Sequence, residues 1–248
     1  MKINYIVPSY KRAKGITTLD YITEAKALIC PEEYEEYRKY HPEWGEDRFI
    51  VAPEGIQGNG KSRALNWMLE NLWDGYDAIV HLDDDIHCYY AHEKDQKDRK
   101  LEEWEVYDVF ERVCILAKDW GCGIWGLNIN SDPLSYDEFK PFRTLAYIDG
   151  GTVGYVRQMK SRYDEELTIK EDVDFFLQNL VEFGKALRVE KYWINKESFT
   201  NEGGCNVFRS SEEEQRQFVM MQKKWGSNII RPNKPTAKKN SKPGRAGG

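Results

Sequence analysis

Ala78-Ile79-Val80-His81-Leu82-Asp83-Asp84-Asp85-Ile86 is the part of the sequence from which the fold class follows. Its first five residues are mostly apolar and predict a buried strand, and three carboxylates follow at the carboxyl end of that strand. Open α/β sheets bind their ligands in a crevice outside this end of their strands. We therefore predict an α/β fold with a functional site at the three aspartates.

The three adjacent carboxylates, Asp83, Asp84 and Asp85, repel one another and repel any phosphate group. They suit a binding site mainly if a hard divalent cation lies between them and an anionic ligand, because such cations prefer oxygen ligands. A second interpretation is that the aspartates cap a helix or a turn after the strand. Capping needs only one aspartate, so the run of three favours a cation site.

Size and composition indicate an ordinary globular protein. The 248 residues are 40% hydrophobic and 31% charged, which fits one large domain. No apolar run is long enough to span a bilayer, and the N-terminus enters a strand at Ile3 to Pro8 without a signal peptide, so we predict a cytoplasmic protein with no membrane partner. The cysteines are odd in number and lack CxxC spacing, which predicts reduced thiols at Cys30, Cys88, Cys114, Cys122 and Cys205.

The end of the chain differs in charge from the rest. The net charge of −6 argues against strong nucleic-acid binding by the whole protein. Residues 231–248 nevertheless carry six basic side chains, three prolines and no acidic residue, so we predict one domain over residues 1–230 and a disordered basic tail over 231–248. Contact with a phosphate backbone and simple solvation are both open as roles for this tail.

Two turns early in the chain have the composition of phosphate-binding sites. The first strand ends in Pro8-Ser9-Tyr10-Lys11-Arg12, whose hydroxyls, ring and cations suit a nucleotide. Gly55-Ile56-Gln57-Gly58-Asn59-Gly60-Lys61-Ser62 fits the P-loop pattern between a strand at 49–52 and a helix at 63–72. A P-loop kinase or ATPase using Lys61 is therefore an alternative. Against it, a complete β-α unit precedes the loop, and only one helix separates the loop from the aspartates.

The remaining chain alternates between predicted helices and strands. Helices are predicted from Thr17 or Thr18 to Ala27, from Leu101 to Trp120 with Trp104, Tyr107 and Phe110 on the core side, and from Ser211 to Lys224. Strands are predicted over 123–129 and 186–194, and an exposed loop over 91–100. Gly150 and Gly151 precede a strand and suit a close approach of a ligand to the backbone.

Glu171 and Asp172 form a second acidic site at the start of a predicted helix that ends at Gly184. One interpretation is that these acids only stabilise the helix dipole. The other is catalytic, because a carboxylate at a helix N-terminus stays ionised at neutral pH and can accept a proton from an attacking hydroxyl.

Four motifs together resemble, in this order, the signature motifs of GT-A nucleotide-sugar glycosyltransferases. They are Pro8 to Arg12, Gly60 to Asn66, Leu82 to Asp85, and Tyr163-Asp164-Glu165 with Glu171-Asp172. The resemblance covers roughly residues 2–191 and implies a three-layer αβα sandwich around a Rossmann-like mixed sheet. It implies a nucleotide-sugar half over about residues 1–90 and an acceptor half over about 91–230. It also implies that the P-loop match is coincidental.

A narrower resemblance concerns bacteriophage enzymes. Ile29-Cys30-Pro31-Glu32, Tyr40-His41-Pro42 and Ala52-Pro53-Glu54-Gly55-Ile56, followed by the three aspartates, resemble the TET-associated glycosyltransferases. That family is similar to the base J DNA glucosyltransferases and is linked with sugar transfer to hydroxymethylated pyrimidines in DNA. The resemblance implies a UDP-sugar donor, a DNA acceptor and a Mn²⁺ or Mg²⁺ cofactor.

The resemblance also implies roles for individual residues. Asp172 would be the base that deprotonates the acceptor hydroxyl in an inverting displacement, with Glu171 beside it. Asp85 would bind the cation with Asp83, which also contacts the ribose. The other nucleotide-sugar contacts implied are Pro8, Ser9, Tyr10, Arg12, Lys61, Arg63 and Asp84, with Gly150 and Gly151 in the acceptor pocket. Two further interpretations stay open at this point, a polysaccharide acceptor and a non-catalytic binding protein of the same fold.

Overall fold

The computed structural model describes residues 1–57, 60–94, 97–196 and 210–232. Its strands are β1 (Ile3–Pro8), β2 (Lys26–Ile29), β3 (Phe49–Val51), β4 (Ala78–Leu82), β5 (Ile86–Ala91), β6 (Arg99–Lys100), β7 (Ile124–Asn128), β8 (Phe142–Arg143), β9 (Thr152–Tyr155) and β10 (Leu187–Lys196). Its α-helices are α1 (Thr18–Tyr21), α2 (Tyr34–Tyr40), α3 (Ser62–Asn71), α4 (Glu103–Asp119), α5 (Glu171–Phe183) and α6 (Ser211–Trp225). Short 3-10 turns are η1 (Pro31–Glu33), η2 (Glu46–Arg48) and η3 (Pro133–Ser135).

All ten strands form one mixed sheet in the order β3-β2-β1-β4-β9-β7-β10-β5-β6, with β8 paired to β10. Strands β1 to β4 are parallel neighbours, and β9 lies antiparallel between β4 and β7. β10 runs parallel to β7 and antiparallel to β5. Since β4 and β7 both run opposite to β9, their carboxyl ends meet at one edge of the sheet, where the aspartates lie.

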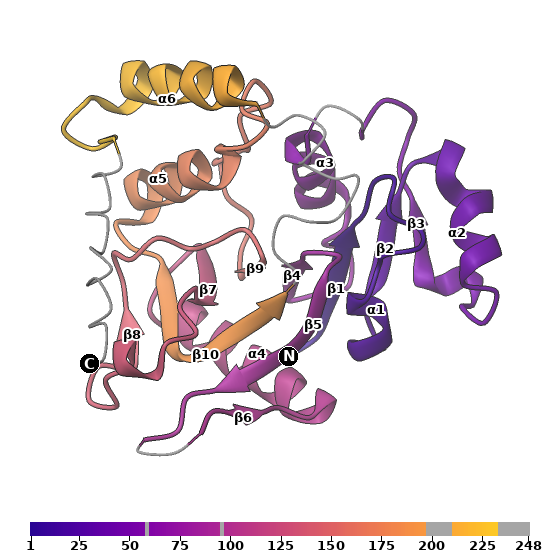
Figure 1. The fold of residues 1–248 in the computed structure, drawn as a ribbon, viewed down its shortest axis with the longest axis horizontal. Helices are drawn as coiled ribbons and strands as arrows, with labels where there is room; N and C mark the ends of the chain where they lie inside the picture. Colours follow the sequence, from indigo (N-terminus) through magenta and orange to yellow (C-terminus); the bar gives the residue numbers. More distant parts are fainter. Residues whose placement is uncertain (58–59, 95–96, 197–209, 233–248) are drawn as a thin grey trace, which may run out of the picture.

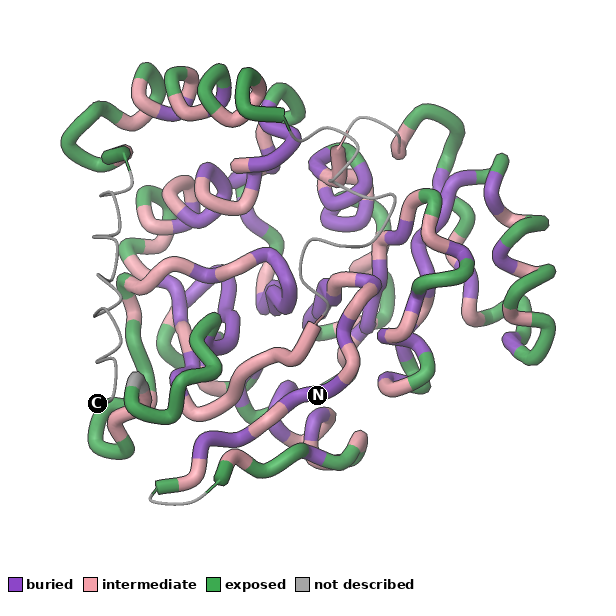
Figure 2. Tube along the Cα trace, viewed as in Figure 1, coloured by how far each residue is buried: buried purple, intermediate pink, exposed green. Residues whose placement is uncertain are grey.

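Helices cover both faces of the sheet, which confirms the predicted αβα sandwich (Figure 1). α4 packs on one face through Phe110, which contacts the ring of the buried Trp125 on β7. α3 and α5 pack on the other face through residues such as Leu65 and Phe175. Figure 2 shows buried residues concentrated in the strands and on the inner sides of these helices. α6 lies outside α5 and forms a partial extra layer.

Several boundaries agree with the sequence patterns. β4 is buried along its whole length, as its apolar composition predicts. α5 ends at Gly184, whose φ of 73° is the left-handed conformation that favours glycine. Four of the five cysteines are free and buried, as predicted, and Cys205 lies outside the described residues. Within the described ranges, no helix has the length and apolar composition required to cross a membrane.

Other predictions were wrong. The helix predicted to run to Ala27 is only Thr18–Tyr21, and Lys26–Ile29 forms strand β2, because pairing with β1 and β3 outweighs the helix propensity of this stretch. The loop predicted over 91–100 contains the end of β5 and strand β6. Trp104, expected on the core side of α4, is 68% exposed. Most of the predicted basic tail, from residue 233 onward, lies outside the described residues.

Candidate active site

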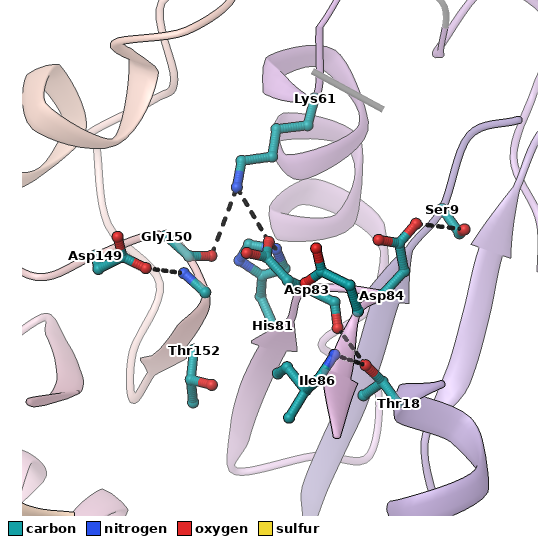
Figure 3. A network of polar contacts seen from close by, with 12 residues as sticks. Ser9, Thr18, Lys61, His81, Asp83, Asp84, Ile86, Asp149, Gly150 and Thr152 are labelled. Atoms are coloured by element: carbon teal, nitrogen blue, oxygen red, sulfur yellow. Dashed lines mark hydrogen bonds and ion pairs between the residues drawn. The ribbon is translucent and has the colours of Figure 1, made fainter. Parts of the chain in front are cut away.

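The three aspartates form the link between β4 and β5, and α1 fixes the backbone of this link. The Thr18 hydroxyl donates to the Asp83 carbonyl at 2.6 Å and accepts from the Ile86 N–H at 2.9 Å. The Thr17 N–H donates to the Asp84 carbonyl at 2.9 Å. Figure 3 shows the Thr18 contacts beneath the carboxylates. The backbone is therefore held from one side, while the side chains diverge to three different environments.

Asp84 turns toward the end of β1 and is held by protein groups. It accepts hydrogen bonds from the Ser9 hydroxyl at 2.7 Å and from Arg12 at 2.6 Å. The buried Tyr37 hydroxyl donates to Ser9 at 2.7 Å. Burial raises the pKa of Asp84, and Arg12 opposes this rise. The structure thus brings together three predicted nucleotide contacts, and both oxygens of Asp84 are engaged in shaping the turn that carries Pro8 and Tyr10.

Asp83 lies between two lysines. Its carboxylate is 3.3 Å from Lys61 Nζ, just before α3, and 3.0 Å from Lys196 Nζ at the end of β10. Burial alone would raise the pKa of Asp83, but the two ammonium groups lower it below its usual range. Lys196 also contacts Asp149 at 3.2 Å. The sequence analysis missed Lys196 and Asp149.

Asp85 is the aspartate with an available oxygen. Its Oδ1 atom is buried and has no hydrogen-bond partner among the residues that the structure describes. Its Oδ2 atom lies 3.5 Å from Arg12. Burial and the neighbouring carboxylates of Asp83 and Asp84 raise the pKa of Asp85 to about 6. A desolvated oxygen among like charges is the environment that a divalent cation relieves.

The side chains present would suit a divalent cation for which the protein supplies only some of the ligands. Over the described part of the chain, no group of three or more His, Cys, Asp or Glu side chains is arranged to hold a metal ion. Mg²⁺ commonly binds through one or two carboxylates and completes its shell with substrate phosphates and waters. Asp85 would suit that pattern as a single protein ligand, and Asp83 would add an oxygen if its lysines turned away.

The second acidic pair lies on the other side of Lys61. Glu171 is 4% exposed at the start of α5, and burial raises its pKa to about 8. Asp172 accepts hydrogen bonds from the Tyr147 hydroxyl and from the Val173 N–H. Burial also raises the pKa of Asp172, so it works against the ionised state at neutral pH that the position at a helix N-terminus predicts for this pair. Lys61 Nζ lies 3.8 Å from Glu171 Oε1, so a single ammonium group separates the two acidic clusters.

Gly150 and Gly151 pack against the lysines of the site. The Gly151 carbonyl accepts from the Asp83 N–H at 2.9 Å, and the Gly150 carbonyl lies 3.5 Å from Lys61 Nζ (Figure 3). A Cβ atom on Gly150 would lie 2.9 Å from Lys61 Nζ, and one on Gly151 would lie 2.8 Å from Lys196 Nζ. These glycines leave room for the two ammonium groups.

Gly151→Ala tests this packing. We expect the new methyl group to displace the end of Lys196, because that end is flexible while the backbone is not. Loss of one well-placed cation should weaken the nucleotide binding that the sequence resemblance implies by about tenfold and change the melting temperature little. Calorimetric titration with UDP and thermal unfolding would measure the two effects. Gly15→Ala is a suitable control, because a Cβ atom at Gly15 would meet nothing within 4 Å. Unchanged affinity in Gly151→Ala would contradict the expectation.

Arg63 and Ser62 lie away from the aspartates. Arg63 pairs with Glu165 at 2.9 Å, and both side chains are exposed. Being two residues beyond Lys61 at the start of α3, Arg63 points to a different side of the helix. The Ser62 hydroxyl is buried and donates to the Leu167 carbonyl at 3.0 Å. A P-loop needs this hydroxyl for its metal ion. Residues 58 and 59 of the predicted P-loop lie outside the described residues.

Comparison with known proteins identifies the family. Residues 3–204 match the family described as TET-Associated Glycosyltransferase. The chain belongs to this family. The TET-associated glycosyltransferase assignment confirms the narrower resemblance seen in the sequence and replaces the P-loop kinase alternative, so the chain is a glycosyltransferase. No curated protein sequence matches the chain.

Solved structures confirm the GT-A fold of this TET-associated glycosyltransferase. S. aureus TarS 1-349 in complex with UDP-GlcNAc aligns with a TM-score of 0.53 and 13% identity, over 93% of this chain and 70% of that one. Glucosyl-3-phosphoglycerate synthase from Mycobacterium tuberculosis, in complex with Mn²⁺, UDP and phosphoglyceric acid, aligns with a TM-score of 0.51 and 13% identity, over 94% of this chain and 80% of that one. The chain spans 60% of two other TarS structures.

Proposed function

We propose that this glycosyltransferase moves a sugar from a UDP-sugar to the hydroxyl of a hydroxymethylated pyrimidine in DNA, with a divalent cation bound at Asp85. The observation that carries the proposal is the position of Lys61. Its Nζ atom lies 3.3 Å from Asp83 and 3.8 Å from Glu171, which joins the aspartate cluster to the acids at the start of α5. Donor phosphates bound beside the aspartates and an acceptor hydroxyl bound beside the acids of α5 would therefore lie close to each other.

The donor side has the charges that a nucleoside diphosphate requires. Lys61 and Lys196 both form ion pairs with Asp83. When the donor binds, its phosphate oxygens could replace Asp83 as the partners of these two ammonium groups. Ser9, Tyr10 and Arg12 lie in the turn after β1, at the same edge of the sheet. The related fold in TarS holds UDP-GlcNAc, and the M. tuberculosis synthase has been crystallised with UDP-glucose and Mn²⁺, which supports a UDP-sugar and a divalent cation here.

The cation fits Asp85 because that carboxylate has a buried oxygen, among like charges, to which no described residue donates a hydrogen bond. When bound, such a cation neutralises the charge that develops on the departing diphosphate. Lys61 and Lys196 add two further positive charges in the same place. We infer that Asp83 contacts the ribose or the cation once these lysines have turned toward the phosphates.

Asp172 is the proposed general base. Its carboxylate is oriented by the Tyr147 hydroxyl and the Val173 N–H, which leaves other lone pairs for the acceptor hydroxyl. Removing the hydroxyl proton makes the oxygen a better nucleophile at the anomeric carbon. Attack from the side opposite to the diphosphate would invert that carbon. Glu171 precedes Asp172 in the chain and lies near Lys61, so its protonation would influence the charge of the Glu171–Asp172 pair.

The DNA acceptor is supported by the description of the family as TET-associated and by the basic residues after position 230. Hydroxymethylated DNA incubated with UDP-sugars and Mn²⁺ should yield nucleosides with a hexose-sized mass gain on mass spectrometry. Transfer to a polysaccharide but not to DNA would replace the acceptor half of the proposal. Absence of both transfer and donor hydrolysis would overturn the enzymatic proposal as a whole.

The buried acids predict a pH dependence. A general base works only when deprotonated, and burial raises the pKa values of Asp172 and Glu171, the latter to about 8. The transfer rate should therefore keep rising with pH above the range in which an ordinary carboxylate has already lost its proton. Measuring kcat at saturating donor from about pH 5 to about pH 9 tests this. A flat profile would mean that the pair is already ionised throughout.

A further inference from the structure

Helix α6 (Ser211–Trp225) lies beyond residue 204, where the family match ends, yet it packs beside the helix that carries the acidic pair. Figure 1 shows α6 running along the outer side of α5. Most of α6 is polar, and two of its side chains, Gln217 and Met221, are buried. A fully buried glutamine needs partners for its amide, and besides Glu213 in α6 itself these partners lie just before Glu171.

Gln217 holds the segment that leads into α5. Its Oε1 atom accepts from the Ile169 N–H at 3.1 Å, and its Nε2 atom donates to the Thr168 hydroxyl at 2.7 Å. Gln217 itself is 0% exposed. These contacts lie two and three residues before Glu171. Loss of the amide would leave a buried backbone N–H without its acceptor.

The same segment contacts the start of α3. The Leu167 carbonyl accepts from Ser62, and Thr168 lies so close to Gly60 that a Cβ atom there would be 3.2 Å away. Lys61 lies between Gly60 and Ser62 in the chain. The segment held by Gln217 therefore contacts the residues before and after Lys61 in the chain and leads directly into Glu171.

The other end of α6 holds the first turn of α5 through Asp174. This carboxylate is 0% exposed and lies 2.9 Å from Lys224 Nζ. It also accepts from the Trp225 indole N–H at 2.7 Å. Asp174 follows Asp172 by two residues in the same turn. α6 thus holds the backbone on both sides of Glu171 and Asp172.

We propose that α6 is a positioning element of the active site and that Gln217 is a positioning residue for Asp172. The inference rests on the proposed role of Asp172 as general base. Gln217 contacts neither donor nor acceptor. It acts by fixing the backbone from Thr168 to Lys170, and hence the place at which α5 begins and the direction of its first carboxylates. A small displacement of a base from its reacting hydroxyl lowers the rate without altering donor binding.

Gln217→Leu tests the proposal in the full-length protein. We expect kcat for sugar transfer to fall by about 10- to 100-fold, with KM for the UDP-sugar changed by less than about twofold. Gln215→Leu, the same exchange at an exposed position two residues away, should leave both constants unchanged. A lower melting temperature with unchanged kcat would overturn the proposal, because it would show that Gln217 only stabilises the fold.

A double-substitution cycle separates this inference from the proposed function. In the Asp172→Asn background, Gln217→Leu should have almost no further effect on kcat, because the group that it positions is already inactive. Full additivity would overturn the role of Gln217. Near-normal activity in Asp172→Asn alone would instead overturn Asp172 as the base.

Trp225→Phe provides a milder variant in case Gln217→Leu folds poorly. It removes the indole N–H that binds Asp174 and keeps an aromatic ring in a half-buried position. We expect kcat to fall by several-fold with an unchanged KM for the donor. Normal kcat in Trp225→Phe, measured on folded protein, would also count against α6 as a positioning element.

Discussion

Asp172→Asn is expected to lower the rate of sugar transfer by about 10²- to 10⁴-fold while UDP binding is retained. The amide has nearly the size of the carboxylate and can still accept from the Val173 N–H, so the first turn of α5 should keep its position. It cannot take the acceptor proton. Mass spectrometry of nucleosides after timed reactions would give the rate, and calorimetric titration with UDP and Mn²⁺ would give the affinity.

The control for this experiment is Glu166→Gln. Glu166 is an exposed acid six residues earlier in the same segment, and its replacement should leave the rate unchanged. A loss in Asp172→Asn that is accompanied by an equal loss of UDP affinity would indicate a disturbed donor site. Retained transfer would move the role of base to another group, and Glu171 would then be the first residue to replace.

Asp85→Asn is the second substitution with a large expected effect: it should lower the rate of sugar transfer and raise the melting temperature of the metal-free protein. Transfer should fall by about 10³-fold, because a neutral amide is a poor ligand for a hard cation. The metal-free protein should at the same time melt about 2 to 4 °C higher, because the substitution removes the repulsion among Asp83, Asp84 and Asp85. Thermal unfolding without metal, and UDP titration with and without Mn²⁺, would measure these changes.

Asp119→Asn, at the exposed end of α4, serves as the matched control and should change neither quantity. If UDP affinity in Asp85→Asn still rises on addition of Mn²⁺ as it does in the unmodified protein, then Asp85 does not hold the cation. A lower melting temperature would contradict the argument that the carboxylate is destabilised by its neighbours. The combination of higher stability and lower activity is typical of a residue retained for function.

The sequence predicted those parts of the fold that depend on local patterns. The apolar run before Asp83 forms a buried strand, and the periodic stretch before Gly184 forms α5. In both stretches the spacing of the apolar residues indicates which side chains are buried. The helix predicted to run to Ala27 was wrong at its end, because the strand conformation of Lys26 and Ala27 in β2 is decided by two neighbouring strands and not by their own residues. Trp104 shows the same limit, since an aromatic residue at a core-like spacing can still lie in solvent.

The candidate site was predictable only where its residues are consecutive. Asp83 to Asp85 and Glu171-Asp172 stand out as acidic runs at the ends of predicted elements. Lys196 does not, because a lysine at the end of a long strand has no distinguishing pattern, and only the pairing of β10 with β5 brings it to Asp83. Tyr147 reaches Asp172 from a loop in the same way. Such contacts are properties of the sheet topology.

The burial of Asp174 has a practical consequence for producing this enzyme. A truncation at residue 204, the boundary that the family match suggests, would remove both Lys224 and Trp225, so Asp174 would lose its counter-charge and the side of α5 that α6 covers would be exposed to water. Shortened versions should therefore express poorly or aggregate, and any protein intended for crystallisation or assay should extend at least through Gly226.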